Sequence, residues 1–185
     1  MTSATQPPRR QLVTGPARSG KSRWAEHLAQ AHEGSVSYLA TGPVLEDDSK
    51  WQLRVEDHQR RRPSHWRTLE LQAALADTLV TFQPGDLALV DSIGTWVAWG
   101  IDQDDSTWAK HCSALLRALD QTPCRVILVA EQTGWGVVPA TSLGGLFRDR
   151  LGALEQHLAA CCETTWLVVA GQALDLSSLG TTVPH

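Results

Sequence analysis

The stretch that most constrains the fold runs from Gly15 to Ser22 and reads GPARSGKS, the glycine, lysine and serine spacing of a phosphate-binding loop. Leu12 and Val13, just before it, are typical of a β-strand, and the residues from Lys21 onward favour a helix. Backbone N–H groups and the helix end bind phosphate together in such a loop. An ordinary turn between a strand and a helix is the alternative, but the complete match in this context favours phosphate binding.

Apolar runs and helical spacings alternate along the rest of the chain. Strands are expected at residues 11–15, 35–41, 86–93, 124–132 and 164–171, and helices at 21–32, 45–62, 71–82, 106–119 and 142–162. Several strands are apolar throughout, which is typical of a parallel sheet covered on both faces. The sequence therefore predicts one α/β domain over residues 11–171, with tails at 1–10 and 172–185.

The composition is that of a globular protein, with 42% apolar and 19% charged residues among 185. A net charge of -4 and a pI near 5.9 give no electrostatic case for nucleic acid as a partner. No early apolar run is long enough for a signal peptide or a membrane span, so we expect a cytoplasmic protein without obligatory membrane contact. The four cysteines lack the spacing of metal sites, and we expect them to be reduced and buried.

Asp91 is the natural complement to the phosphate loop, because it ends the apolar run LALVD. An acid at the carboxyl end of a buried strand can bind Mg²⁺ together with the Ser22 hydroxyl, while Lys21 reaches the terminal phosphates. The alternative is that Asp91 caps a helix that DSIGTW begins.

A histidine lies within the arginine-rich segment RVEDHQRRRPSHWRTLE. A helix through it puts Arg54, His58 and Arg61 or Arg62 on one face. Neighbouring guanidinium groups disfavour the imidazolium, and a neutral imidazole on a phosphate-attracting face can attack phosphorus. A solvated charged face with a structural histidine is the alternative, and His65 is a competing nucleophile. The pattern alone does not choose between them.

Taken together, these segments resemble the bifunctional adenosylcobinamide kinase/adenosylcobinamide-phosphate guanylyltransferases of cobalamin biosynthesis. The matching stretches, in order, are LVTGPARSGKSRWAE, VSYLATG, RVEDHQRRRPSHWRTLE, LALVDSIGTW, VILVAEQTGWGVVP, FRDRLGALEQHLA and WLVVAG. They cover nearly everything except the two tails. The resemblance implies a RecA-like P-loop NTPase fold, with a mostly parallel sheet covered by helices on both faces. It also implies a homotrimer with active sites near the subunit boundaries.

The resemblance also assigns site residues. His58 corresponds to the histidine that GTP guanylylates, because it lies four residues before Arg62-Pro63, which excludes His65. His58 and Lys21 are the implied catalytic residues. The implied nucleotide contacts are Gly15, Pro16, Ala17, Arg18, Ser19, Gly20, Lys21, Ser22, Ala40, Thr41, Gly42, Gln59, Arg60, Arg61, Arg62, Glu70 and Asp91. Ser22 and Asp91 are the implied ligands of Mg²⁺ or another divalent cation.

The implied activity has two steps on small molecules. ATP or GTP first phosphorylates adenosylcobinamide, which requires mainly positioning and charge neutralisation. His58 then takes GMP from GTP, expels pyrophosphate and passes the GMP to adenosylcobinamide phosphate, giving adenosylcobinamide-GDP. Two other functions fit the phosphate loop: a single-activity small-molecule kinase in which His58 is structural, and a nucleotide-gated regulatory module.

Some residues depart from the family pattern or invite a further role. This chain has Asp91 where the family often has Glu, and Asp57 where it often has His. It also has Arg60-Arg61 in place of Asp-Gly and Glu155 in place of Asn. We therefore expect differences in the fine nucleotide or corrinoid contacts. The eight tryptophans are expected mainly in the core or at subunit contacts. Trp96 and Trp99 are candidates for an assembly surface, Trp135 for a mobile lid, and Glu131 for the catalytic region.

Overall fold

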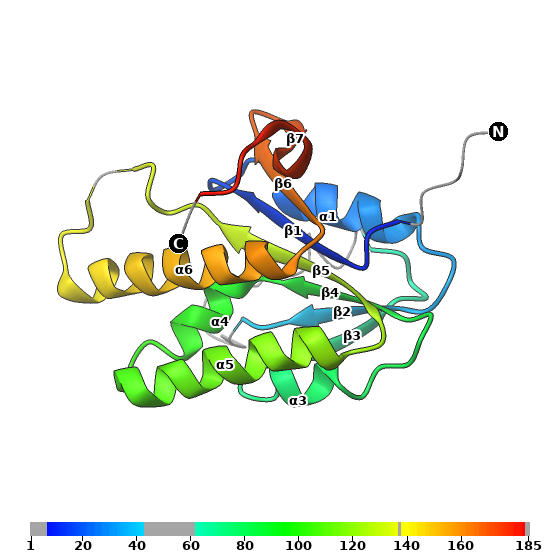
Figure 1. Ribbon diagram of the computed structural model, residues 1–185, viewed down its shortest axis with the longest axis horizontal. Coiled ribbons are helices and arrows are strands. Elements are labelled where there is room, and N and C mark those ends of the chain that lie inside the picture. Colours follow the sequence, from blue (N-terminus) through cyan, green and yellow to red (C-terminus); the bar gives the residue numbers. More distant parts are fainter. Residues whose placement is uncertain (1–6, 43–61, 137, 184–185) are drawn as a thin grey trace.

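A seven-stranded sheet forms the centre of the computed structural model, which describes residues 7–42, 62–136 and 138–183 (Figure 1). The strands lie in the order β3-β2-β4-β5-β1-β6-β7. Adjacent strands are parallel, except that β7 runs antiparallel to β6. The bounds are β1 (Arg10–Gly15), β2 (Val36–Ala40), β3 (Arg67–Glu70), β4 (Leu87–Asp91), β5 (Arg125–Glu131), β6 (Thr164–Val169) and β7 (Gln172–Asp175).

Helices pack on both faces of this sheet (Figure 1). Helix α1 (Lys21–Gln30) packs on one face. The other face carries α3 (Leu75–Leu79), α4 (Ile93–Trp99), α5 (Asp105–Gln121) and α6 (Ser142–Cys161). A short helix, α7 (Leu176–Leu179), packs beside β6. None of the helices in the described ranges is both long and apolar enough to span a bilayer.

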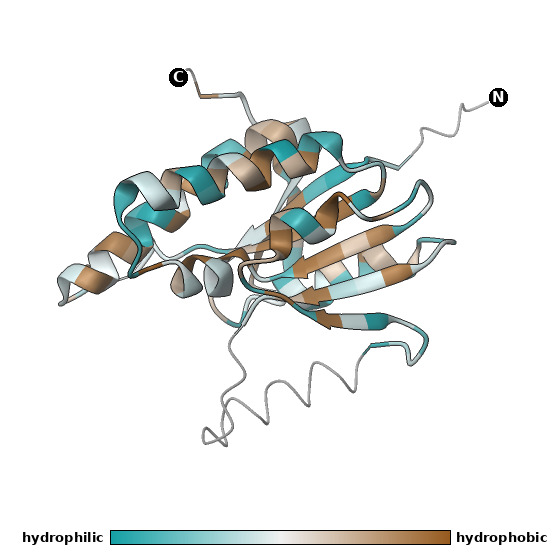
Figure 2. Ribbon diagram, turned by 90° about the horizontal axis from the view of Figure 1, so that it is seen from below, coloured by the Kyte–Doolittle hydropathy of each residue, from teal (hydrophilic) through white to brown (hydrophobic). Residues whose placement is uncertain are grey.

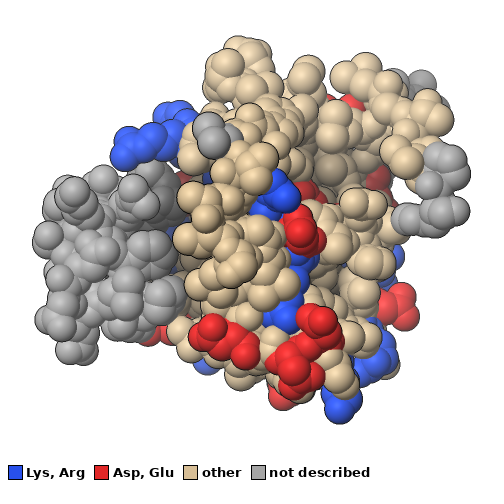
Figure 3. All heavy atoms as spheres, turned by 90° about the vertical axis from the view of Figure 1, so that its left-hand side faces the viewer, with Lys and Arg blue, Asp and Glu red and all other residues tan. Residues whose placement is uncertain are grey.

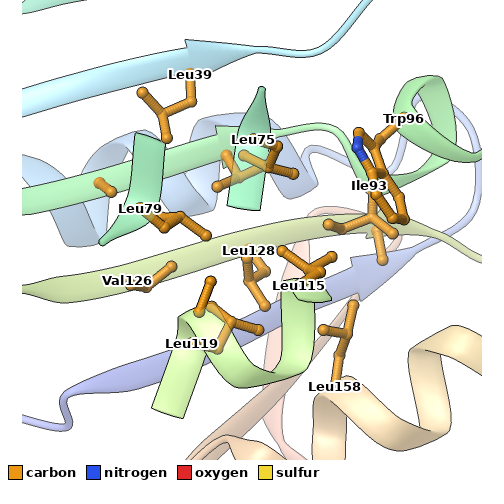
Figure 4. Packing of buried hydrophobic residues seen from close by; sticks show 14 of the residues in the cluster. Leu39, Leu75, Leu79, Ile93, Trp96, Leu115, Leu119, Val126, Leu128 and Leu158 are labelled. Atoms are coloured by element: carbon orange, nitrogen blue, oxygen red, sulfur yellow. The ribbon is translucent and has the colours of Figure 1, made fainter. Parts of the chain in front are cut away.

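Two apolar clusters fill the space between the sheet and its helices. In β5, Val126 and Leu128 face the cluster under α3 to α6, whereas Ile127 and Val129 face the cluster under α1. Figure 4 shows how side chains of the first cluster converge from the strands and helices. Figure 2 shows hydrophobic residues along the strands and mixed character on the covering helices. The central strands β4 and β5 are mostly apolar because both of their faces are buried.

The predicted strands and the long helices are confirmed to within a few residues at their ends. The helix expected at 45–62 lies outside the described residues. The helix expected at 71–82 is shorter, because only Leu75–Leu79 is helical. Val80 and Thr81, which follow the observed helix, are β-branched and favour helix less.

Two strands escaped the sequence analysis. Strand β3 pairs with β2 but reads RTLE, so it has no apolar run to reveal it. Residues 172–179 were expected in a tail, and the structure corrects this: they form β7 and α7. Ala170 and Gly171 both have positive φ, of 49° and 75°, and turn the chain between β6 and β7. Positive φ at two successive residues is typical of a tight hairpin, and glycine tolerates it without strain.

Two expectations about packing need correction. Trp96 is 2% exposed, lies near Trp108, and donates its indole N–H to the Gln72 carbonyl oxygen at 3.1 Å, so it belongs to the core and not to an assembly surface. The four cysteines are free thiols, as expected, but only Cys124 is fully buried. Burial raises the pKa of Cys162 to about 12, so this thiol stays protonated.

The core of the α5 face gives a direct test of the packing. Leu115 is fully buried there, and Leu115→Ala should lower the free energy of unfolding by about 2–5 kcal/mol, because a cavity remains. The control Leu179→Ala, at a site 73% exposed, should change it by less than about 0.5 kcal/mol. Urea denaturation with an unchanged m-value measures both. Equal effects at the two sites would contradict the assigned core.

Candidate nucleotide-binding site

The parallel register brings five residues to one edge of the sheet, at the carboxyl ends of the strands. Gly15 of β1 pairs with Glu131 of β5, and Asp91 of β4 pairs with Ala40 of β2. Ala40 pairs in turn with Glu70 of β3. Figure 3 looks onto this side of the molecule, where basic and acidic side chains lie close together among mostly uncharged residues. Ligands of α/β sheets bind at such strand ends.

The loop between β1 and α1 has the shape of a phosphate cradle. A Cβ atom at Gly15 would lie 2.2 Å from the Val168 carbonyl oxygen, so no side chain fits there. Gly20 has a φ of 101° and leads into α1 without a side-chain cap, which leaves the helix N–H groups for a ligand. The buried Ser19 Oγ has no hydrogen-bond partner within the described residues. These features fit a bound anion.

Asp91 is not the cap of the helix that follows it. The Ser92 side chain accepts a hydrogen bond from the Thr95 backbone N–H at 3.3 Å and forms a capping box, so the capping alternative for Asp91 is wrong. Instead, Asp91 Oδ2 accepts a hydrogen bond from the Tyr38 hydroxyl at 3.0 Å. The carboxylate therefore lies on the α1 side of the sheet, the side on which the phosphate loop enters its helix.

Tyr38 also contacts Arg62, a predicted nucleotide ligand. The Arg62 guanidinium carbon lies 3.6 Å from the centre of the Tyr38 ring, and Arg62 Nη1 donates to Thr68 Oγ1 at 3.2 Å. Burial, followed by the charge of Asp91, holds the pKa of Tyr38 well above its usual value, so the phenol remains a donor. Sequence reasoning missed Tyr38, which looks like an ordinary strand residue.

Glu131 ends β5 between the phosphate loop and Asp91. Its Oε2 accepts the Gly94 N–H at 2.9 Å, and a Cβ atom at Gly94 would lie 2.0 Å from that oxygen. Burial raises the pKa of Glu131, a hydrogen bond from Ser92 and the charge of Lys21 oppose the rise, and the charge of Asp91 adds to it. The structure thus brings Lys21, Asp91 and Glu131 together, in line with the expected catalytic region.

Glu155 on α6 is a second buried carboxylate, and it lies near Thr14, which directly precedes the phosphate loop. Gln132 Nε2 donates to both of its oxygens at 2.8 Å and also to Thr14 Oγ1 at 3.2 Å. Burial raises the pKa of Glu155, hydrogen bonds from Thr14 and Gln132 oppose the rise, and the charge of Glu131 adds to it. Glu131 and Glu155 also line a cavity of about 390 Å³.

The remaining predicted ligands fall into three groups. Ala40 ends β2, and Thr41 and Gly42 follow it, but the Thr41 hydroxyl donates to the Ser92 carbonyl oxygen at 2.5 Å. Glu70 ends β3 and is exposed. The nucleophile candidate and its neighbours lie outside the described residues: His58, Gln59, Arg60 and Arg61.

The donor set of the site fits Mg²⁺. The Ser22 hydroxyl and the Asp91 and Glu131 carboxylates offer oxygen atoms, which hard cations prefer. Among the described residues no group of three or more His, Cys, Asp or Glu could hold a metal ion by itself.

The buried Glu155 carboxylate predicts a pH dependence of stability. Because its folded-state pKa is raised, ionisation opposes folding once the pH exceeds the unfolded value of about 4.3. Glu155→Gln should therefore raise Tm at neutral pH, with the gain shrinking as the pH falls through the raised folded-state pKa toward the unfolded value of about 4.3. Thermal denaturation between about pH 4 and pH 8 measures it. Asp149→Asn, at an exposed carboxylate of the same helix, should show no such trend; a pH-independent Glu155→Gln effect would refute the explanation.

Comparisons with known proteins agree with this geometry. The family model for cobinamide kinase / cobinamide phosphate guanyltransferase matches residues 11–176. The bifunctional adenosylcobalamin biosynthesis protein CobP of Pseudomonas aeruginosa is 41% identical over 90% of this chain and 96% of its own length. The proteins of the same description named CobU are 39% identical in Salmonella typhimurium and 36% in Escherichia coli, each over 86% of this chain and 95% of the relative.

Solved structures add evidence on the fold alone. A prototypical ATPase from the type III secretion system of pathogenic bacteria matches 94% of this chain with a TM-score of 0.54 at 9% identity. The ATPase EscN of enteropathogenic E. coli matches 95% with a TM-score of 0.57 at 10% identity. This chain spans 59% and 50% of those two chains. The predicted RecA-like P-loop fold is confirmed, and the chain belongs to the family of cobinamide kinase / cobinamide phosphate guanyltransferases.

Proposed function

We propose that this chain phosphorylates adenosylcobinamide with ATP or GTP and then transfers GMP to the product through His58, giving adenosylcobinamide-GDP. The single observation that carries the proposal is the row of strand ends that joins the phosphate loop to Asp91 and Glu131. Support also comes from the matching family model, whose name contains both activities. The relatives are similar over nearly their whole length, and each is described as bifunctional.

The kinase step uses the loop and the row of carboxylates. Loop N–H groups and the start of α1 bind the phosphates, and Lys21 neutralises the terminal phosphate charge. Ser22 and Asp91 would hold Mg²⁺, which would supply further charge neutralisation. The substrate hydroxyl attacks the γ-phosphorus in line and releases its proton, the bond between the γ-phosphorus and the β-phosphate oxygen breaks, and the nucleoside diphosphate leaves.

The guanylyl transfer has two displacements at the α-phosphorus of GTP. An imidazole nitrogen of His58 forms a P–N bond while the bond to the β-phosphate oxygen breaks, and pyrophosphate leaves. A phosphate oxygen of adenosylcobinamide phosphate then attacks the same phosphorus, and the P–N electron pair returns to the imidazole. Arg62, four residues beyond His58, contributes a guanidinium group suited to the charge on these phosphates.

We further propose a cytoplasmic homotrimer. The start of α6 and the segment before it extend past the sheet (Figure 1) and expose the apolar side chains of Trp135, Val138, Leu143 and Leu146. Such apolar side chains on an extension favour contact with another subunit. Trp135, which is 56% exposed, remains a candidate for a lid near that contact.

Labelled GTP tests the proposed transfer. After incubation with Mg²⁺ and GTP, the denatured chain should retain label from the α-phosphate but none from the γ-phosphate, because the His58 adduct keeps only GMP. His58→Ala should lose the α-label, and the control His65→Ala should keep it.

Other outcomes point to the two alternatives. Absence of α-label, with γ-label still reaching cobinamide, would leave a single-activity kinase. Absence of both transfers, with GTP binding intact, would favour a regulatory module.

The proposed assembly surface predicts a change of oligomeric state. Leu143→Glu together with Leu146→Glu should dissociate the trimer, because two charges would be buried in an apolar contact. Sedimentation equilibrium measures the mass. Leu179→Glu, at a site 73% exposed on α7, is the control and should leave the trimer intact. A trimer that survives the double substitution, or a wild-type monomer, would contradict the proposed contact.

A further inference from the structure

Tyr38 lies between two parts of the site that act on different phosphates. It is 4% exposed and packs in the cluster under α1, so its ring cannot move freely. Its hydroxyl donates to Asp91 Oδ2 at 3.0 Å, and its ring face carries the Arg62 guanidinium at 3.6 Å. One side chain thus contacts both Asp91, the proposed metal ligand, and Arg62, a proposed phosphate ligand. Among the described residues, Arg62 is the proposed phosphate ligand nearest to His58 in the sequence.

The strand register explains how one residue reaches both. Tyr38 pairs with Leu89 in β4, two positions before Asp91, so the phenol points along the sheet toward the carboxylate. On its other side Tyr38 pairs with Thr68 in β3, the residue whose hydroxyl accepts from Arg62. Arg62 therefore lies across a neighbouring pair of residues, Tyr38 and Thr68.

We infer that Tyr38 is a positioning residue with two separable arms: its hydroxyl orients Asp91 toward the divalent cation, and its ring holds Arg62 toward the phosphates. The role of Tyr38 in the reaction rests on the proposed function, whereas its contacts with Asp91 and Arg62 rest on the geometry above. Substitution of a partner that orients a metal-binding ligand typically costs about 10–100-fold in metal affinity or activity. An aromatic face fixes a guanidinium group by cation–π contact and leaves its N–H groups able to bind oxygen atoms.

The two arms can be tested separately. Tyr38→Phe removes the hydroxyl and keeps a ring under Arg62, so it should weaken Mn²⁺ binding to the complex with a β,γ-imido GTP analogue by roughly tenfold. Electron paramagnetic resonance of free Mn²⁺ measures the binding without any catalytic turnover.

Thr68→Val is the matched variant for the other arm, because Thr68 contacts Arg62 and pairs with Tyr38. It should leave Mn²⁺ affinity unchanged. It should lower the rate at which the chain is labelled from the α-phosphate by about threefold, the effect of one lost hydrogen bond. In an Asp91→Asn background, Tyr38→Phe should cause no further loss of Mn²⁺ affinity. Additive losses would show that the hydroxyl does not act through Asp91.

The chain contains a single tyrosine, so 3-fluorotyrosine labels this position while keeping its hydroxyl. This keeps the test decisive if Tyr38→Phe does not fold. The ¹⁹F resonance should shift when Mg²⁺ joins the nucleotide complex, and should not shift in Asp91→Asn. Wild-type Mn²⁺ affinity in Tyr38→Phe, or an unmoved ¹⁹F resonance, would overturn the inference. Failure of the proposed function would appear separately, as absent corrinoid turnover with these binding results intact.

Discussion

The parallel register of the central strands is the constraint on which the rest of the structure depends. It brings the carboxyl ends of β1, β5, β4, β2 and β3 to one side of the sheet, where the phosphate loop, Asp91 and Glu131 lie. Because the strands are buried on both faces, a slip of one residue would turn Asp91 toward the wrong helices. The two apolar clusters therefore fix the site as well as the core.

The parts of this arrangement that could be predicted from sequence are those written in local patterns. The glycine loop, the apolar strands and the long amphipathic helices each lie within a few consecutive residues, and the structure contains them. The roles of Tyr38 and Glu131 depend on which residues face each other across strands, and no single segment shows that. Thr68 and Gly94 likewise acquire meaning only through Arg62 and Glu131.

The family resemblance predicted features that local sequence patterns do not determine, and only some of these predictions are established. It identified the family and the fold, which the comparisons establish. The choice of His58 over His65 remains a proposal, because His58 lies outside the described residues. The acids show a different limit. Glu131 and Glu155 are read from sequence as charged, yet burial raises the pKa of both, which only the folded environment can determine.

The two outermost strands of the sheet have a consequence for how copies of the chain can meet. Both β3 and β7 are four residues long, and they carry charged side chains at Arg67, Glu70 and Asp175. Short, charged border strands discourage strand addition from another molecule, which is the usual route to aggregation of open sheets. With both borders guarded in this way, helices and loops are left as the surfaces through which subunits can associate in an ordered and limited manner.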